Sequence, residues 1–146
     1  MACVLLVHVV KTFWELEAWQ LCDELRREIE IIIAAPRVRR EVKFCDQIRG
    51  SADSACANTA EGFGRYYPAE FRRFLVIARG SLTETQSHLA AALSRKYLSR
   101  EDFDRLIHLS SRAIGANTSL QKYLRERRGV GYPAGHSTKG TRDDEP

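Results

Sequence analysis

The stretch from Asp46 to Leu89 constrains the fold of this 146-residue chain more than any other. Its second half carries apolar or small residues at alternating steps of four and three, which keeps one face of a helix apolar along its length. These positions are Phe71, Leu75, Ala78, Leu82, Thr85, Leu89 and Ala92. Its first half consists largely of small residues, which let neighbouring helix backbones approach closely. The stretch predicts two long bundle helices joined at a glycine turn.

Two further amphipathic segments complete the predicted bundle. The first begins at a capping box, in which the Thr12 hydroxyl accepts a hydrogen bond from the Glu15 amide, and it ends at Pro36. The last begins at a cap on Ser99, where a side-chain oxygen can accept from the first turn. No strand pattern is present. We therefore predict an all-α fold, an up-down-up-down antiparallel four-helix bundle over residues 13–128.

Both ends of the chain lie outside the predicted bundle. Residues 1–12 begin with an apolar run that is too short to span a bilayer. This run fits a strand-like arm, or an extension upstream of the true start, better than a weak export signal. Residues 129–146 are rich in Gly, Pro and charge, so we predict a disordered tail. We expect no membrane partner.

Composition and cysteine usage favour a cytoplasmic protein without a cofactor or metal. The formal net charge of +4 permits nucleic acid as a partner without requiring it. Cys3, Cys22, Cys45 and Cys56 form no CxxC pair, and we predict reduced, structural thiols. None of the four histidines has a glutamate three residues before it, whereas a di-iron bundle needs Glu-x-x-His on two helices. We predict no catalytic residue and no enzyme activity.

One segment resembles a known family. The string N-x-A-E-G-F-G-R spans residues 58–65, F-x-x-F-L-x-I-A-x-G-S-L-x-E spans residues 71–84, and D-Q-I-R spans residues 46–49. Together they resemble the bacterial four-helix bundle protein family, also called the 23S ribosomal RNA intervening-sequence protein family. The resemblance covers residues 13–125. This chain departs from the usual pattern at Gly50, where a second arginine is common, and at residues 56–57, where Cys-Ala replaces Ile-Pro.

The resemblance implies a small helical bundle that assembles into a homo-oligomer, a pentamer. Some members are encoded within inserts in ribosomal RNA genes. Related proteins accompany diversity-generating retroelement reverse transcriptases as basic, nucleic-acid-binding accessories. The resemblance brings no catalytic residue to this chain.

The motif residues themselves have a structural interpretation. Asp46 with Arg49, Arg49 with Asp53, and Glu61 with Arg65 stand at spacings that allow ion pairs along a helix. A buried amide needs hydrogen-bond partners, so Asn58 is expected to fix a helix register or a subunit contact. Gly62 and Gly64 are expected to end the helix in a left-handed cap conformation.

A first basic group, Arg65, Arg72 and Arg73, lies around the start of the third helix. Positive charge is unfavourable at the positive end of a helix dipole. A bound anion would remove the conflict, since the helix N-terminus also offers free amides. The alternative is that these arginines reach the carboxylates of a neighbouring subunit. Both interpretations stay open on the sequence.

A second basic group, Arg37, Arg39, Arg40 and Lys43, is predicted at the opposite end, where the topology would also bring Lys96 and Arg100. Repeated around a ring, such a group suits an RNA or DNA backbone, whereas in a monomer it fits a solvated loop. Phe44 and Tyr97 are expected to cap the core rather than stack on bases. We predict a non-catalytic accessory factor that binds RNA or DNA. The alternative is a protein-binding scaffold, accessory to a reverse transcriptase or another enzyme.

Overall fold

Four long helices account for most of the residues in this computed structural model, which describes residues 10–65 and 67–127. Helix α1 spans Glu17–Ala34, α2 spans Val42–Phe63, α3 spans Pro68–Ser94 and α4 spans Arg100–Glu126. A short 3-10 turn, η2, spans Phe13–Glu15. No strand occurs in the described part of the chain, and the all-α prediction is confirmed. The predicted tail, residues 129–146, lies outside the described residues, as does most of the extension over residues 1–12.

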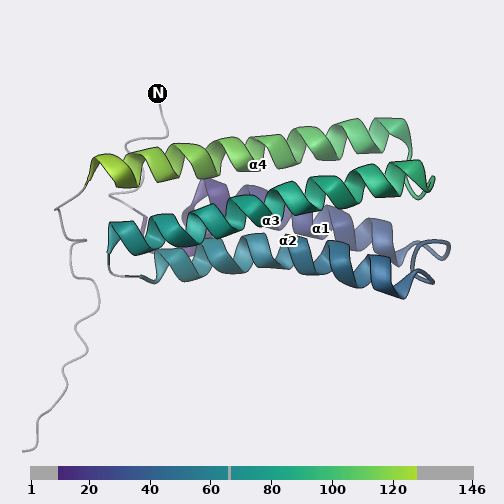
Figure 1. Cartoon of the computed structure of the whole chain (residues 1–146), viewed down its shortest axis with the longest axis horizontal. Coiled ribbons are helices and arrows are strands. Elements are labelled where there is room, and N and C mark those ends of the chain that lie inside the picture. Colours follow the sequence, from purple (N-terminus) through teal and green to yellow (C-terminus); the bar gives the residue numbers. More distant parts are fainter. Residues whose placement is uncertain (1–9, 66, 128–146) are drawn as a thin grey trace, which may run out of the picture.

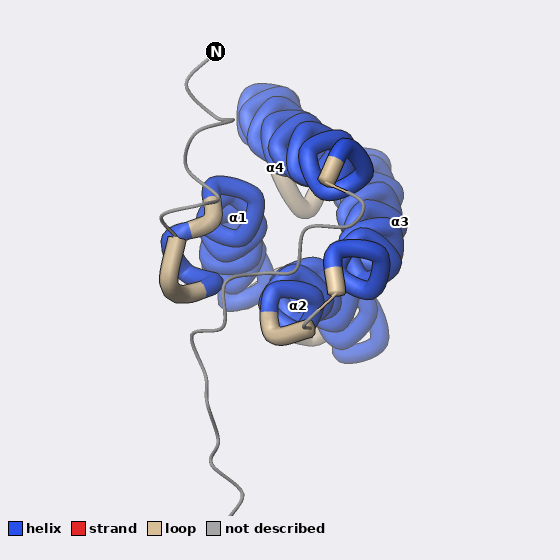
Figure 2. The backbone as a smooth tube through the Cα atoms, turned by 90° about the vertical axis from the view of Figure 1, so that its left-hand side faces the viewer, coloured by secondary structure: helices blue, strands red, loops and turns tan. Residues whose placement is uncertain are grey.

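The helices are arranged as a bundle. The α1–α2 and α3–α4 connections lie at one end, and the α2–α3 connection lies at the other (Figure 1). Consecutive helices therefore run in opposite directions. A view along the bundle shows α1 next to α2 and α4, with α3 on the far side of the core (Figure 2). Each helix thus has two neighbours and one face toward solvent.

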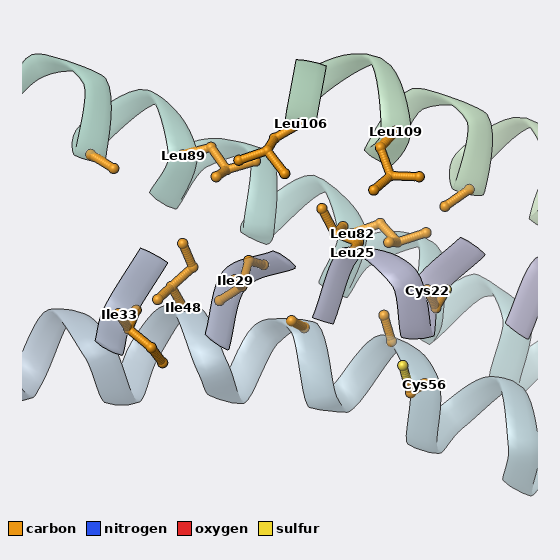
Figure 3. Packing of buried hydrophobic residues seen from close by; sticks show 14 of the residues in the cluster. Cys22, Leu25, Ile29, Ile33, Ile48, Cys56, Leu82, Leu89, Leu106 and Leu109 are labelled. Atoms are coloured by element: carbon orange, nitrogen blue, oxygen red, sulfur yellow. The ribbon is translucent and has the colours of Figure 1, made fainter. Parts of the chain in front are cut away.

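The inward faces are those that the periodicity predicts. All seven apolar or small positions named for α3 are buried. Leu25 and Ile29 of α1 meet Leu82, Leu89 and Leu106 in the centre of the bundle (Figure 3).

Three of the four cysteines belong to this core. Cys22, Cys45 and Cys56 are buried and free, which confirms the structural interpretation of these three. Burial raises the pKa of the Cys22 thiol, and likewise that of Cys56, to about 12. Cys3 lies outside the described residues.

Helices α2 and α3 are joined along a seam of small and hydroxyl-bearing residues. Thr85 Oγ1 lies 2.9 Å from Ser51 Oγ, and the Ser54 and Ser81 hydroxyls are 2.8 Å apart. At the end of the seam, Gly62 is buried, and a Cβ atom there would be 2.6 Å from Cδ2 of Phe71. Small side chains thus allow the close approach that the sequence indicates.

Two predicted helix ends need correction. Gly62 lies inside α2, and Gly64 caps it with φ −71°, so neither is shown in the predicted left-handed conformation. The chain leaves α2 at Gly64 and enters α3 at Pro68, which lies in the first turn of α3. The predicted capping box is also wrong: the Thr12 hydroxyl donates to the Glu15 carboxylate at 2.6 Å and precedes η2, while α1 begins at Glu17. The Ser99 cap is confirmed, because Ser99 Oγ accepts from the Asp102 amide at 3.0 Å.

Candidate nucleic-acid interface

The connection from α1 to α2 displays three arginines around one buried valine. Val38 is 1% exposed, its amide donates to the Ala35 carbonyl at 2.9 Å, and its own carbonyl accepts from the Cys45 thiol at 3.3 Å. Because Val38 is held in the core, the residues beside it are directed to solvent. Arg37, Arg39 and Arg40 are all exposed. The connection is therefore held in one conformation by the burial and hydrogen bonds of Val38.

The connection from α3 to α4 holds Lys96 in an unusual conformation. Its φ is 59°, which is the left-handed region that favours glycine. The Tyr97 amide donates to Ala92 at 2.8 Å, and the Lys96 amide donates to Leu93 at 3.0 Å. These two bonds are those of a Schellman motif, in which glycine is the usual residue at the position of Lys96. A lysine thus occupies a position where the backbone favours glycine.

These two connections form the basic end, which we define as Arg37, Arg39, Arg40, Lys43, Arg95 and Lys96. Within residues 36–43 and 95–100, Glu41 is the only acidic residue. None of the six forms an ion pair with a described residue. Arg100 was predicted to join them, but its Nε donates to Asp104 at 3.0 Å.

Arg95 was not predicted from the sequence. Its guanidinium carbon lies 5.5 Å from the centroid of the Phe44 ring, at cation–π distance. The only sequence feature that could have indicated Arg95 as part of this group is its position directly before Lys96, at the end of the amphipathic pattern of α3.

The aromatic residues of this end face the core, as predicted. Phe44 is buried, and its ring centroid lies 5.3 Å from that of Tyr97, which is half-buried. Neither ring is presented as a stacking platform for a base. The basic end is thus suited to phosphate groups rather than to unpaired bases.

The other predicted basic group lies at the opposite end of the bundle. Arg65 pairs with Glu61, as predicted, and its guanidinium carbon is 4.6 Å from the centroid of the Phe74 ring. Arg72 is half-buried and Arg73 is exposed, and neither pairs with a carboxylate in the described part of the chain. The 22 residues of α2 span about 33 Å between the two ends. The nine basic residues predicted as a site therefore form two separate groups.

The remaining motif residues contribute to the bundle itself. Arg49 Nε donates to Glu30 of α1 at 2.9 Å, which raises the pKa of Arg49, and its contact with Asp46 is longer, at 3.5 Å. The predicted pair with Asp53 is not formed. The half-buried Asn58 donates to the Ser54 carbonyl at 2.8 Å, within its own helix. The structure therefore shows no bond from this amide to another helix.

Residues 10–65 and 67–127 show neither a group of metal ligands nor a helix able to span a membrane. No three His, Cys, Asp or Glu side chains there are grouped so that they could hold a metal ion. His88 Nε2 lies 3.5 Å from the Glu84 carboxylate, without a third potential ligand. No helix in these ranges has the length and apolar character needed to cross a membrane.

The model of the family described as 23S rRNA-intervening sequence protein matches residues 14–117. No curated protein matches the chain.

Proposed function

We propose that this chain, which belongs to the 23S rRNA-intervening sequence protein family, binds a nucleic-acid backbone through its basic end as a non-catalytic accessory factor. The description of the family refers to 23S ribosomal RNA, so structured RNA is the first ligand to test, with duplex DNA as the second. The proposal places the protein in the cytoplasm, where its buried thiols stay reduced.

One observation carries the proposal: the basic end has exposed cations with no carboxylate partner among the described residues, and they are held by ordered turns. Arg37, Arg39 and Arg40 surround the anchored Val38, and Lys96 lies in a turn closed by two hydrogen bonds. Such cations can bind the phosphate oxygens of a nucleic acid, and this binding releases counterions from the nucleic acid.

The proposal includes self-association into a closed homo-oligomer, for which the family resemblance implies a pentamer. In a ring, the basic ends of the subunits would lie side by side. Their fields would add, and several contacts to one nucleic acid would act together.

Binding across a salt series tests the proposal. A variant with Arg37, Arg39 and Arg40 changed to alanine is compared with a control in which Arg112, Lys122 and Arg125 are changed to alanine. The control residues lie on α4, away from the basic end, and their replacement removes the same net charge. We expect the first variant to bind labelled RNA and duplex DNA more weakly. For the duplex, the slope of log K against log salt should flatten by about 0.9 for each phosphate that the variant no longer neutralises.

The control variant should retain the wild-type slope. Equal weakening in the two variants would show that only net charge matters and would contradict a located interface. If wild-type protein bound neither ligand at low salt, the proposal would be wrong, and the basic end would be assigned to a protein partner such as a reverse transcriptase.

A further inference from the structure

Helices α2 and α3 present matching stripes on their outer faces. Asp46, Gly50 and Asp53 follow one another on α2 at steps of four and three, and Arg72, Val76 and Arg79 do so on α3. Residues at these steps lie on one side of a helix. Five of the six are exposed, and Arg72 is half-buried. One stripe is acid, glycine, acid, and the other is base, valine, base.

The centre of each stripe is unusual for a helix surface that faces water. Val76 is 58% exposed, and its neighbour Ile77 is 44% exposed. Gly50 lies inside α2, where glycine weakens a helix relative to alanine. A Cβ at Gly50 would meet no atom within 4 Å, so packing within the chain does not require glycine there. An open glycine on one helix and an exposed valine on the next are complementary in shape.

Gly115 of α4 also has open space around it, but its surroundings differ. None of the large hydrophobic side chains exposed in the described part of the chain lies on α4. The outer face of α4 is therefore a matched control surface rather than a second candidate.

The charges of the two stripes are complementary and largely unused within the chain. Asp53, Arg72 and Arg79 form no ion pair with another described residue, and Asp46 has only its 3.5 Å contact with Arg49. When Gly50 is placed against Val76, each aspartate falls opposite an arginine. This holds for parallel helices, where Asp53 meets Arg79. In antiparallel helices, Asp46 lies opposite Arg79 and Asp53 lies opposite Arg72. Each pair is then offset by one residue, which is about 1.5 Å along the helix axis.

We propose that these stripes bind a second copy of this chain, with Gly50 of one copy against Val76 of the next and an aspartate–arginine pair on each side. The inference rests on the homo-oligomer in the proposed function and assigns its contact surface. Parallel pairing corresponds to a two-fold dimer, which would take the place of the pentamer in the proposed function. Antiparallel pairing corresponds to a ring whose axis runs along the bundle. It also assigns Arg72 to a neighbouring subunit rather than to a bound anion.

Charge reversal followed by charge exchange tests the surface in the full chain. Association is measured by sedimentation or light scattering across a concentration series, and circular dichroism confirms that each variant is helical. We expect Arg79→Asp to weaken association about tenfold or more, because it places two acids opposite each other. Adding Asp53→Arg should restore association if the helices pair in parallel, and adding Asp46→Arg should restore it if they pair antiparallel. Arg112→Asp on α4 should leave association unchanged.

The contact between Gly50 and Val76 is tested by a second substitution with a matched control on α4. Gly50→Leu should disrupt association, because the added side chain takes the space assigned to Val76 of the second copy. Gly115→Leu should leave it intact.

The outcomes separate this surface from the rest of the proposed function. If Arg79→Asp and Gly50→Leu leave association unchanged, or if neither charge exchange restores it, the proposed contact surface is wrong. The homo-oligomer itself would then still hold. A wild-type chain that is monomeric at every concentration would overturn both. RNA binding by the basic end, measured on the same samples, is a separate readout.

Discussion

Lys96 is held in a left-handed conformation at the point where α3 ends. For an L-residue with a side chain this conformation costs about 1–2 kcal/mol, and glycine would avoid the cost. Residues kept in unfavourable conformations cluster at functional sites. Lys96 lies within the basic end, so we interpret its positive charge as serving binding despite the backbone strain.

Lys96→Gly should therefore separate stability from binding. We expect the variant to be more stable by about 1 kcal/mol, which corresponds to a rise of about 4 °C in Tm. We also expect weaker binding to nucleic acid, with a duplex salt slope flatter by about 0.9. Thermal unfolding and the salt series measure the two effects. A variant that bound as tightly as wild type would remove Lys96 from the interface.

Gly62 is required by close packing rather than by its own backbone conformation. A Cβ there would be 2.6 Å from Cδ2 of Phe71 and 2.9 Å from Cβ of Phe74. The sequence pointed to this glycine but for a different reason, since a helix cap is a local feature and a clash with the next helix is not. Only the packing of α2 against α3 reveals the requirement.

Gly62→Ala should destabilise the chain by about 1–3 kcal/mol, because overpacking forces the rings of α3 to move. Gly64→Ala is the matched control. Its added Cβ would lie 3.4 Å from the nearest atom, and the backbone is helical, so we expect a change below about 0.5 kcal/mol. Chemical denaturation of both variants measures the difference. Equal effects would contradict the packing requirement.

At the scale of elements, α2 and α3 are joined through buried hydroxyl groups as well as apolar packing. The Thr85 hydroxyl is fully buried and lies 2.9 Å from both Ser51 Oγ and the Ser81 carbonyl oxygen. Ser51 in turn donates to the Ile48 carbonyl at 3.0 Å. The bond between Thr85 and Ser51 is expected to fix the register of α2 and α3 along the seam.

Thr85→Val keeps the shape of the side chain and removes the hydroxyl. We expect the unfolding free energy to fall by about 1–2 kcal/mol, because a buried partner is left without its hydrogen bond. Thr83→Val changes an exposed residue of the same helix and should cost less than about 0.5 kcal/mol. The comparison uses denaturant midpoints, and a neutral Thr85→Val would show that the hydroxyl bond contributes nothing.

Helix α4 shows what a periodic pattern misses. Its apolar residues Leu106, Ala113, Leu120 and Leu124 are buried, whereas Phe103, Ile107 and Ile114 are half-buried. Asn117 is fully buried as well, and its amide donates to the Leu75 carbonyl of α3 at 3.0 Å. A buried amide is tolerated only when it finds such partners. The partner is 42 residues away in the chain, so a pattern within one helix gives no sign of it.

In the whole molecule, the topology brings basic residues that are distant in the sequence to the same end of the bundle. Some of these residues form ion pairs with carboxylates of this chain, so their charge is already neutralised. The antiparallel order of the helices was sufficient to predict that Arg37, Arg39, Arg40 and Lys43 would share an end with Lys96. From the sequence we predicted the pair of Arg65 with Glu61, but not the pair of Arg100 with Asp104. Arg100 and Arg65 each have a carboxylate four residues away in the chain, and both form that pair.

An arginine footprint with and without RNA examines directly whether the basic end binds RNA. Phenylglyoxal modification of the full chain is followed at each arginine by peptide mass spectrometry, at a salt concentration where the complex forms. We predict RNA-dependent protection of Arg37, Arg39 and Arg40, with unchanged modification of Arg112 and Arg125 on α4. Protection of the α4 arginines, with the α1–α2 turn still fully reactive, would contradict binding at the basic end.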